Sequence, residues 1–100
     1  MSDATAVSIE EGLSPGTVTK NRVGAMTHLF PRGNLDDAEL LDALSATVDE
    51  CIAAQEVQLI IDMVSVSLVD SKALETLFNL RQELARVGGW LKITNAKPLI

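Results

Sequence analysis

The chain has 100 residues and a formal net charge of −6, and 47% of its residues are hydrophobic while only 3% are aromatic. This length favours one domain, the hydrophobic share excludes a disordered chain, and the acidic balance argues against nucleic acid as a partner. The single cysteine, Cys51, excludes an internal disulfide and favours a reducing compartment. The first residues do not have the pattern of a secretory signal, and no apolar run is long enough to span a bilayer. We therefore expect a cytoplasmic protein without membrane insertion.

The first 16 residues are predicted to form an N-terminal segment separate from the domain. Thr5–Glu10 alternates weakly between apolar and polar residues and is interpreted as a possible first strand. Gly12–Gly16 combines glycine, serine and proline, which favour turns over regular structure. The domain proper is accordingly expected to occupy residues 17–100.

Two short extended pieces are expected next. They are Thr17–Lys20 and Val23–Phe30, separated by a turn at Asn21-Arg22. Proline cannot donate a ladder hydrogen bond and glycine weakens a strand. Pro31 and Gly33 are therefore expected to end the second piece.

A helix is predicted from about Asp37 to Ala54. Asp36 and Glu39 have the spacing of a capping box, in which each side chain accepts a hydrogen bond from a free backbone N–H. Residues of one face follow at helical spacing: Leu40, Leu41, Leu44, Val48, Cys51, Ile52 and Gln55.

Acidic side chains gather in the middle of the chain. No lysine or arginine occurs between Arg32 and Lys72, and nine carboxylates fall in that interval: Asp36, Asp37, Glu39, Asp42, Asp49, Glu50, Glu56, Asp62 and Asp70. Such a stretch is either a solvated helix face or the electrostatic complement of a basic partner surface.

The second half of the chain reads as a strand, a helix and a strand. Val57–Asp62 is a β-branched run typical of a strand covered on both faces, and Trp90–Thr94 is a second strand. The helix between them spans Asp70–Val87 and is ended by Gly88-Gly89. Its inward stripe is predicted to hold Leu74, Leu77, Phe78, Arg81 and Leu84. A βαβ unit requires parallel strands, so the fold class is α/β, with helices packed on a mixed β-sheet.

Few residues support catalysis or metal binding. His28 is the only histidine, and it has no second histidine or cysteine cluster to complete a ligand set. Cys51 lies on the apolar helix face beside Asp49 and Glu50, whereas a reactive thiolate needs an electropositive setting. We therefore predict no catalytic residue, no metal site, no cofactor and no enzymatic activity.

Asp70-Ser71, at the start of the second helix, is the strongest functional candidate. In one interpretation, either residue simply caps the helix, as Asp and Ser often do. Alternatively, the hydroxyl of Ser71 lies where free N–H groups and the helix dipole would tolerate an added phosphate. Ser65 and Ser67 carry two further hydroxyls on the approach to this position.

The stretch Asp62-Met63-x-x-Val66-x-x-Val69-Asp70-Ser71-x-Ala73-Leu74 resembles the signature of the STAS domain, the fold of the anti-sigma factor antagonists. Gly33-Asn34-Leu35-Asp36 resembles the step that precedes the first helix in that family. The resemblance extends from about Val23 to Ile100. It implies a STAS-like mixed sheet, and it also implies that this chain stops at Pro98-Leu99-Ile100, near the start of a final helix. Such an end would leave a face open and favour a homodimer.

The resemblance implies that Ser71 is phosphorylated by a bacterial serine kinase that is also an anti-sigma factor. The unphosphorylated chain would bind this kinase, and the phosphorylated chain would release it. Asp36, Ser67, Asp70, Ser71 and Lys72 are the partner-binding residues expected on this basis. Lys72-Ala73 departs from the residues common in the family after Asp-Ser. A STAS adaptor or scaffold without a switch, in a transporter or stress-signalling assembly, is the alternative.

Overall fold

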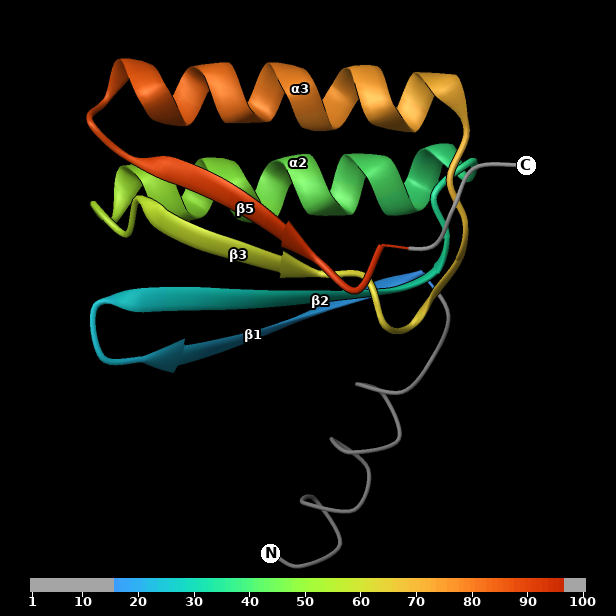
Figure 1. The fold of residues 1–100 in the computed structure, drawn as a ribbon, viewed down its shortest axis with the longest axis horizontal. Coiled ribbons are helices and arrows are strands. Elements are labelled where there is room, and N and C mark those ends of the chain that lie inside the picture. The colour runs from blue at the N-terminus through green and yellow to red at the C-terminus, as the bar shows by residue number, and fades with distance from the viewer. Residues whose placement is uncertain (1–15, 97–100) are drawn as a thin grey trace, which may run out of the picture.

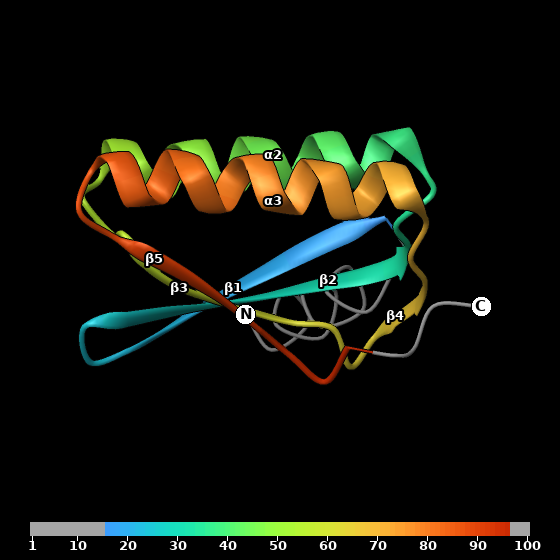
Figure 2. The same cartoon turned by 45° about the horizontal axis from the view of Figure 1, so that its top comes forward.

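The computed structural model describes residues 16–96, which form one mixed sheet with two helices on one of its faces (Figures 1 and 2). The strand order is β1-β2-β3-β5, and β4 pairs with β2. The elements in chain order are β1 (Thr17–Val23), β2 (Met26–Asn34), α2 (Ala38–Ala53), β3 (Gln58–Asp62), β4 (Val66–Leu68), α3 (Ser71–Arg86) and β5 (Trp90–Thr94). The strand predicted over Thr5–Glu10 and the helical turn predicted at Pro98 lie outside the described residues.

The predicted α/β class with a mixed sheet is confirmed. β1 and β2 are antiparallel, whereas β2, β3 and β5 are mutually parallel. α2 connects β2 to β3, and α3 connects β3 to β5, so the chain forms two consecutive βαβ units. Because β2 and β3 are parallel, both helices begin at the same end of the molecule (Figure 1), and both lie on the same face of the sheet (Figure 2).

The β1–β2 hairpin turns later in the chain than the sequence predicts. Asn21 and Arg22 belong to β1, and the turn is made by Gly24 and Ala25. Gly24 adopts a φ of 62°, in the left-handed region that glycine enters without a steric penalty. The prediction of a turn at Asn21-Arg22 is therefore wrong.

Pro31 does not end β2, which continues to Asn34. Pro31 is buried and lies opposite Val18 of β1. The pairing of β2 with β3 covers only Thr27–Leu29, so the missing N–H of the proline interrupts no bond to β3. This position explains why a proline is tolerated inside an interior strand.

The core lies between the helices and the sheet face beneath them. α2 buries five residues of its predicted stripe: Leu40, Leu41, Leu44, Val48 and Cys51. Ile52 is half-buried, and Gln55 lies beyond the end of the helix and is exposed. Leu59 and Ile61 of β3 meet this layer from below and have no exposed surface. Each fully buried leucine or isoleucine stabilises the fold by about 1.5–3 kcal/mol relative to an exposed one.

The stripe predicted for α3 is wrong in part, because Leu77 and Leu84 are buried as predicted but the other three residues of the stripe are not. The buried residues are Ala73, Leu77, Leu80 and Leu84. Leu74 and Phe78 are instead 41% and 55% exposed, and Arg81 is exposed as well. The sequence offers two adjacent apolar rows on this helix, and packing against α2 and the sheet selects the row that begins with the small Ala73.

Among residues 16–96, helices cover β3 on one face only, contrary to the prediction for Val57–Asp62. Its burial alternates, with Leu59 and Ile61 buried and Ile60 half-buried. The reason is that α2 and α3 share one face of the sheet (Figure 2). A run of β-branched residues thus did not require helices on both sides.

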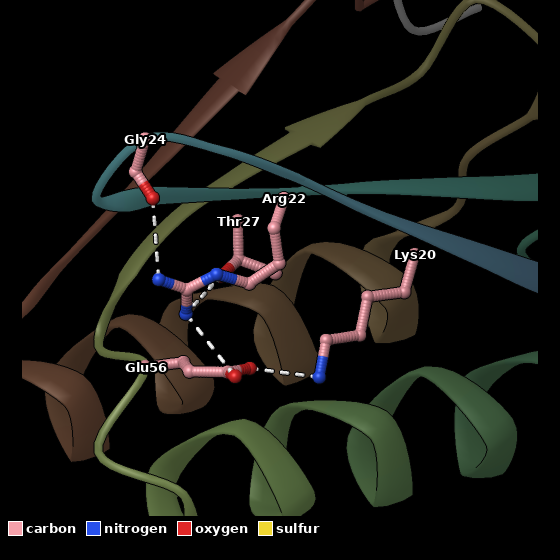
Figure 3. Close-up of polar contacts among 5 residues, drawn as sticks. All are labelled: Lys20, Arg22, Gly24, Thr27 and Glu56. Atoms are coloured by element: carbon pink, nitrogen blue, oxygen red, sulfur yellow. Dashed lines mark hydrogen bonds and ion pairs between the residues drawn. The ribbon is translucent and has the colours of Figure 1, made fainter.

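A cluster of charges ties the β1–β2 hairpin to the segment that follows α2 (Figure 3). Glu56 lies 2.7 Å from the Lys20 ammonium and 3.1 Å from the Arg22 guanidinium. Arg22 also donates to the Thr27 hydroxyl and to the Gly24 carbonyl. The hydrogen bond from Lys20 lowers the pKa of the Glu56 carboxyl, and the same bond raises the pKa of Lys20.

Candidate partner-binding site

The candidate phosphorylation site is the first residue of α3. Asp70 is the N-cap, and its Oδ1 accepts a hydrogen bond from the Ala73 N–H at 2.8 Å. The backbone carbonyl of Asp70 accepts from Leu74 N–H, which starts the helix. Ser71 follows as the first helical residue and is exposed, as is Lys72. Asp70 therefore performs the capping, while the Ser71 hydroxyl lies at the surface.

The loop before α3 is held to the end of β2 by a short strand that the sequence did not predict. In β4, Val66 pairs with Gly33 and Leu68 pairs with Asn34. The Leu35 N–H also donates to the Leu68 carbonyl at 2.8 Å. This pairing places the exposed Ser67 beside the start of α2, far from it in sequence.

The capping box predicted for Asp36 and Glu39 is wrong. Asp37 is the N-cap of α2, and its Oδ1 accepts from Glu39 N–H at 2.9 Å. A backbone bond from Asp37 N–H to the Asn34 carbonyl closes a turn immediately before the helix, which delays its start by one residue. Asp36 lies in that turn and is exposed.

Two surface depressions meet at Asp36. The larger has a volume of about 490 Å³, and Asp36 and Ser67 both line it. Its other lining residues are Gly16, Gly33, Asn34, Asp37 and Glu39. The smaller, of about 140 Å³, lies between the first turns of the two helices and is lined by Asp36, Asp42 and Lys72 together with Ala38, Leu41, Ser45 and Thr76.

The structure thus gathers the five predicted partner-binding residues at one end of the domain, where both helices begin (Figure 1). Asp36 is beside Ser67 in one depression and beside Lys72 in the other. Asp70 and Ser71 start α3 directly before Lys72, without lining either depression. Sequence reasoning missed Asn34, Asp37 and Glu39 as lining residues, because their placement depends on the pairing of β4 with β2.

An apolar depression of about 270 Å³ lies between α3 and β5. It is lined by Leu74, Leu77, Phe78, Arg81, Leu91 and Ile93. Leu74, Phe78 and Arg81, which were predicted to lie on the buried face of α3, therefore line this surface depression instead.

Cys51 and His28, the residues considered for thiol and metal chemistry, lie within helix α2 and strand β2. Cys51 has no exposed surface, and burial raises the pKa of its thiol. The ring of His28 lies 6.1 Å from that of Phe30, centroid to centroid, on β2. Within residues 16–96, His, Cys, Asp and Glu side chains form no group of three or more that could hold a metal ion. In the same part of the chain, neither helix is long and apolar enough to cross a membrane.

Comparison with known proteins identifies the domain type. A sequence model described as the STAS domain matches residues 16–100. No curated protein matches the chain.

Several solved structures share the fold. The unphosphorylated anti-sigma factor antagonist SpoIIAA is similar with a TM-score of 0.68 and 19% identity, covering 82% of this chain and 76% of SpoIIAA. Mglu is similar with a TM-score of 0.72 and 12% identity, covering 86% of this chain. The glutamate form of Mglu has a TM-score of 0.59 and 16% identity, over 86% of this chain and 29% of that one. This chain spans only 22% of the first Mglu chain, so the similar unit is a small part of a larger protein there.

Proposed function

This chain belongs to the STAS domain family, and on that premise we propose that it is an anti-sigma factor antagonist of the bacterial cytoplasm that works by partner switching. Unphosphorylated, it binds a serine kinase that is also an anti-sigma factor. Phosphorylation of Ser71 by that kinase ends the complex. The protein acts by binding and carries no catalytic residue of its own.

The exposed hydroxyl of Ser71 is the observation that carries this proposal. Ser71 begins α3 at the surface, while Asp70 accepts the Ala73 N–H and so keeps the helix start in place. A kinase can therefore reach the hydroxyl without unfolding the helix. The fold likeness to SpoIIAA, an anti-sigma factor antagonist, supports the assignment of the partner class.

Charge explains how one phosphate would end binding. Phosphoserine carries about −1.5 to −2 charges at neutral pH. The surrounding surface already carries carboxylates: Asp36, Asp37, Glu39, Asp42 and Asp70. A partner that fits a neutral hydroxyl at Ser71 would have to desolvate a dianion with no matching cation on the partner's own surface, which is costly in a packed interface.

A phosphorylation assay tests the proposal. The chain is incubated with the candidate anti-sigma kinase and ATP, and phosphate incorporation and complex formation are followed by mass spectrometry and gel filtration. We expect one phosphate per chain, located on Ser71, and none in Ser71→Ala. A Ser71→Asp variant that binds the kinase as tightly as the unmodified chain would contradict the switch.

A STAS module without a switch is the second candidate. The observation in its favour is that the similar unit forms only 22% and 29% of the two Mglu chains, so this fold also occurs as a small part of a larger protein. In that role Asp70-Ser71 would be a contact position within an assembly. Stable co-purification with such an assembly, with no phosphate incorporated by any serine kinase of the source, would favour it.

A further inference from the structure

Lys72 is the basic residue next to the candidate phosphorylation site in α3. It follows Ser71 directly in the first turn of α3 and is exposed. The next basic residue along the helix is Arg81, which at 1.5 Å per residue lies roughly 15 Å from Ser71. Of the basic residues of α3, Lys72 is therefore the one close enough to Ser71 to act on a phosphate there.

Lys72 shares a surface depression with two carboxylates but forms no ion pair with them. Asp36 and Asp42 line the same small depression between the helices. Within the described part of the chain, ion pairs join Lys20 and Arg22 to Glu56, and Lys72 takes part in none. The carboxylate of Asp70 is engaged by the Ala73 N–H. Lys72 can therefore turn toward a new anion without breaking an existing ion pair.

We infer that Lys72 is the intramolecular counter-ion of a phosphate on Ser71, and that it limits how strongly the modification disfavours the complex. The inference rests on the proposed function, since it takes Ser71 as the modified residue. Pairing with Lys72 offsets part of the added charge inside the chain. The partner then faces a smaller change in charge than phosphoserine alone would produce.

The second ionisation of the phosphate reports this pairing. A free phosphoserine has a second pKa of about 6, and a nearby cation lowers this pKa because it favours the dianion. Unit charges roughly 7 Å apart in water change a pKa by about 0.3 to 0.5 unit. The effect is screened in about 1 M salt, where the Debye length falls to about 3 Å.

Phosphorus NMR titration of the full 100-residue chain with phosphoserine installed synthetically at position 71 is the test. We expect Lys72→Gln to raise the phosphate pKa by about 0.3 to 0.5 unit at low salt, with the difference lost in high salt. Lys72→Arg should leave the pKa low, and Arg81→Gln, the matched loss of one exposed charge on the same helix, should not move it.

Equal pKa values for the Lys72→Gln and Arg81→Gln chains would overturn the inference, as would a difference that survives high salt. Because the phosphate is introduced chemically, this result does not depend on any kinase. A failure of the kinase assay above together with a normal titration would reject the proposed function while leaving the counter-ion role of Lys72 intact.

Discussion

The N-cap of α3 gives the sharpest test of how the candidate site is held. Replacing Asp70 by alanine removes the acceptor of the Ala73 N–H, which is bonded at 2.8 Å. Loss of an Asp cap costs about 1 kcal/mol, within a range of about 0.5–2 kcal/mol. For a domain of this size, 1 kcal/mol corresponds to a fall in Tm of about 4–8 °C.

Chemical and thermal unfolding of three variants measures this effect. Asp70→Asn keeps a side-chain oxygen that can accept the same bond, so we expect it to stay within a few tenths of a kcal/mol of the parent. Asp36→Ala should also be close to neutral, because Asp37 caps α2 and Asp36 accepts no capping bond. The urea midpoint, at constant slope, is the quantity to compare.

Equal destabilisation by Asp70→Ala and Asp70→Asn would refute the capping argument, because the two changes differ in the oxygen that accepts the bond. A loss of about 1 kcal/mol in Asp36→Ala would refute the observed assignment of the α2 cap. Asp70→Asn also removes one negative charge beside Ser71 while keeping the helix start. The variant therefore separates the charge of this position from its structural role.

Three further predictions concern packing and pH. Leu80→Ala should lower the free energy of unfolding by about 2–5 kcal/mol, because Leu80 is buried. Phe78→Ala should lower it by less than about 1 kcal/mol, because Phe78 is 55% exposed. Similar losses in the two variants would contradict the observed buried face of α3. Gly89→Ala should cost about 1–3 kcal/mol in the same measurement, since a methyl group there would overlap the backbone of the segment before β3; an unchanged urea midpoint would contradict that close approach. Because the pKa of Glu56 is lowered in the folded state, the unfolded chain binds more protons in acid. The contribution of Glu56 to stability is therefore fully present above pH 4.5 and is lost as the pH falls through the pKa of the folded state. Glu56→Gln should flatten this part of the curve of urea midpoint against pH, and an unchanged acid slope would contradict the ion-pair assignment.

The helices were predictable because their signals are local. Asp and Ser before an apolar row indicate the start of α3, and Gly88, with a φ of 83°, marks its end as predicted. The buried face of α3 could not be chosen in the same way. Leu74 and Phe78 form a row as apolar as that of Leu77 and Leu80, and only the position of α2 and the sheet decides between them.

The site was predictable in part for the same reason. Ser71 could be placed at a helix start from the neighbouring residues alone. The position of Ser67 next to Asp36 depends on the pairing of β4 with β2, which joins residues more than thirty positions apart. The charge cluster of Lys20, Arg22 and Glu56 is equally non-local, and the lysine and arginine alternate along β1 without a pattern that indicates their partner.

The start of α2 lies at the candidate partner-binding site, whereas the segment beyond its other end stabilises the fold. This separation has an evolutionary consequence. At its start lie the exposed carboxylates of the turn, while Glu56, just beyond its other end, anchors the hairpin through Lys20 and Arg22. A helix of 16 residues holds these regions roughly 24 Å apart. Mutations at such distances usually add independently. Paralogues could thus acquire different binding partners through mutations at the start of α2, while the residues beyond its other end preserve the fold.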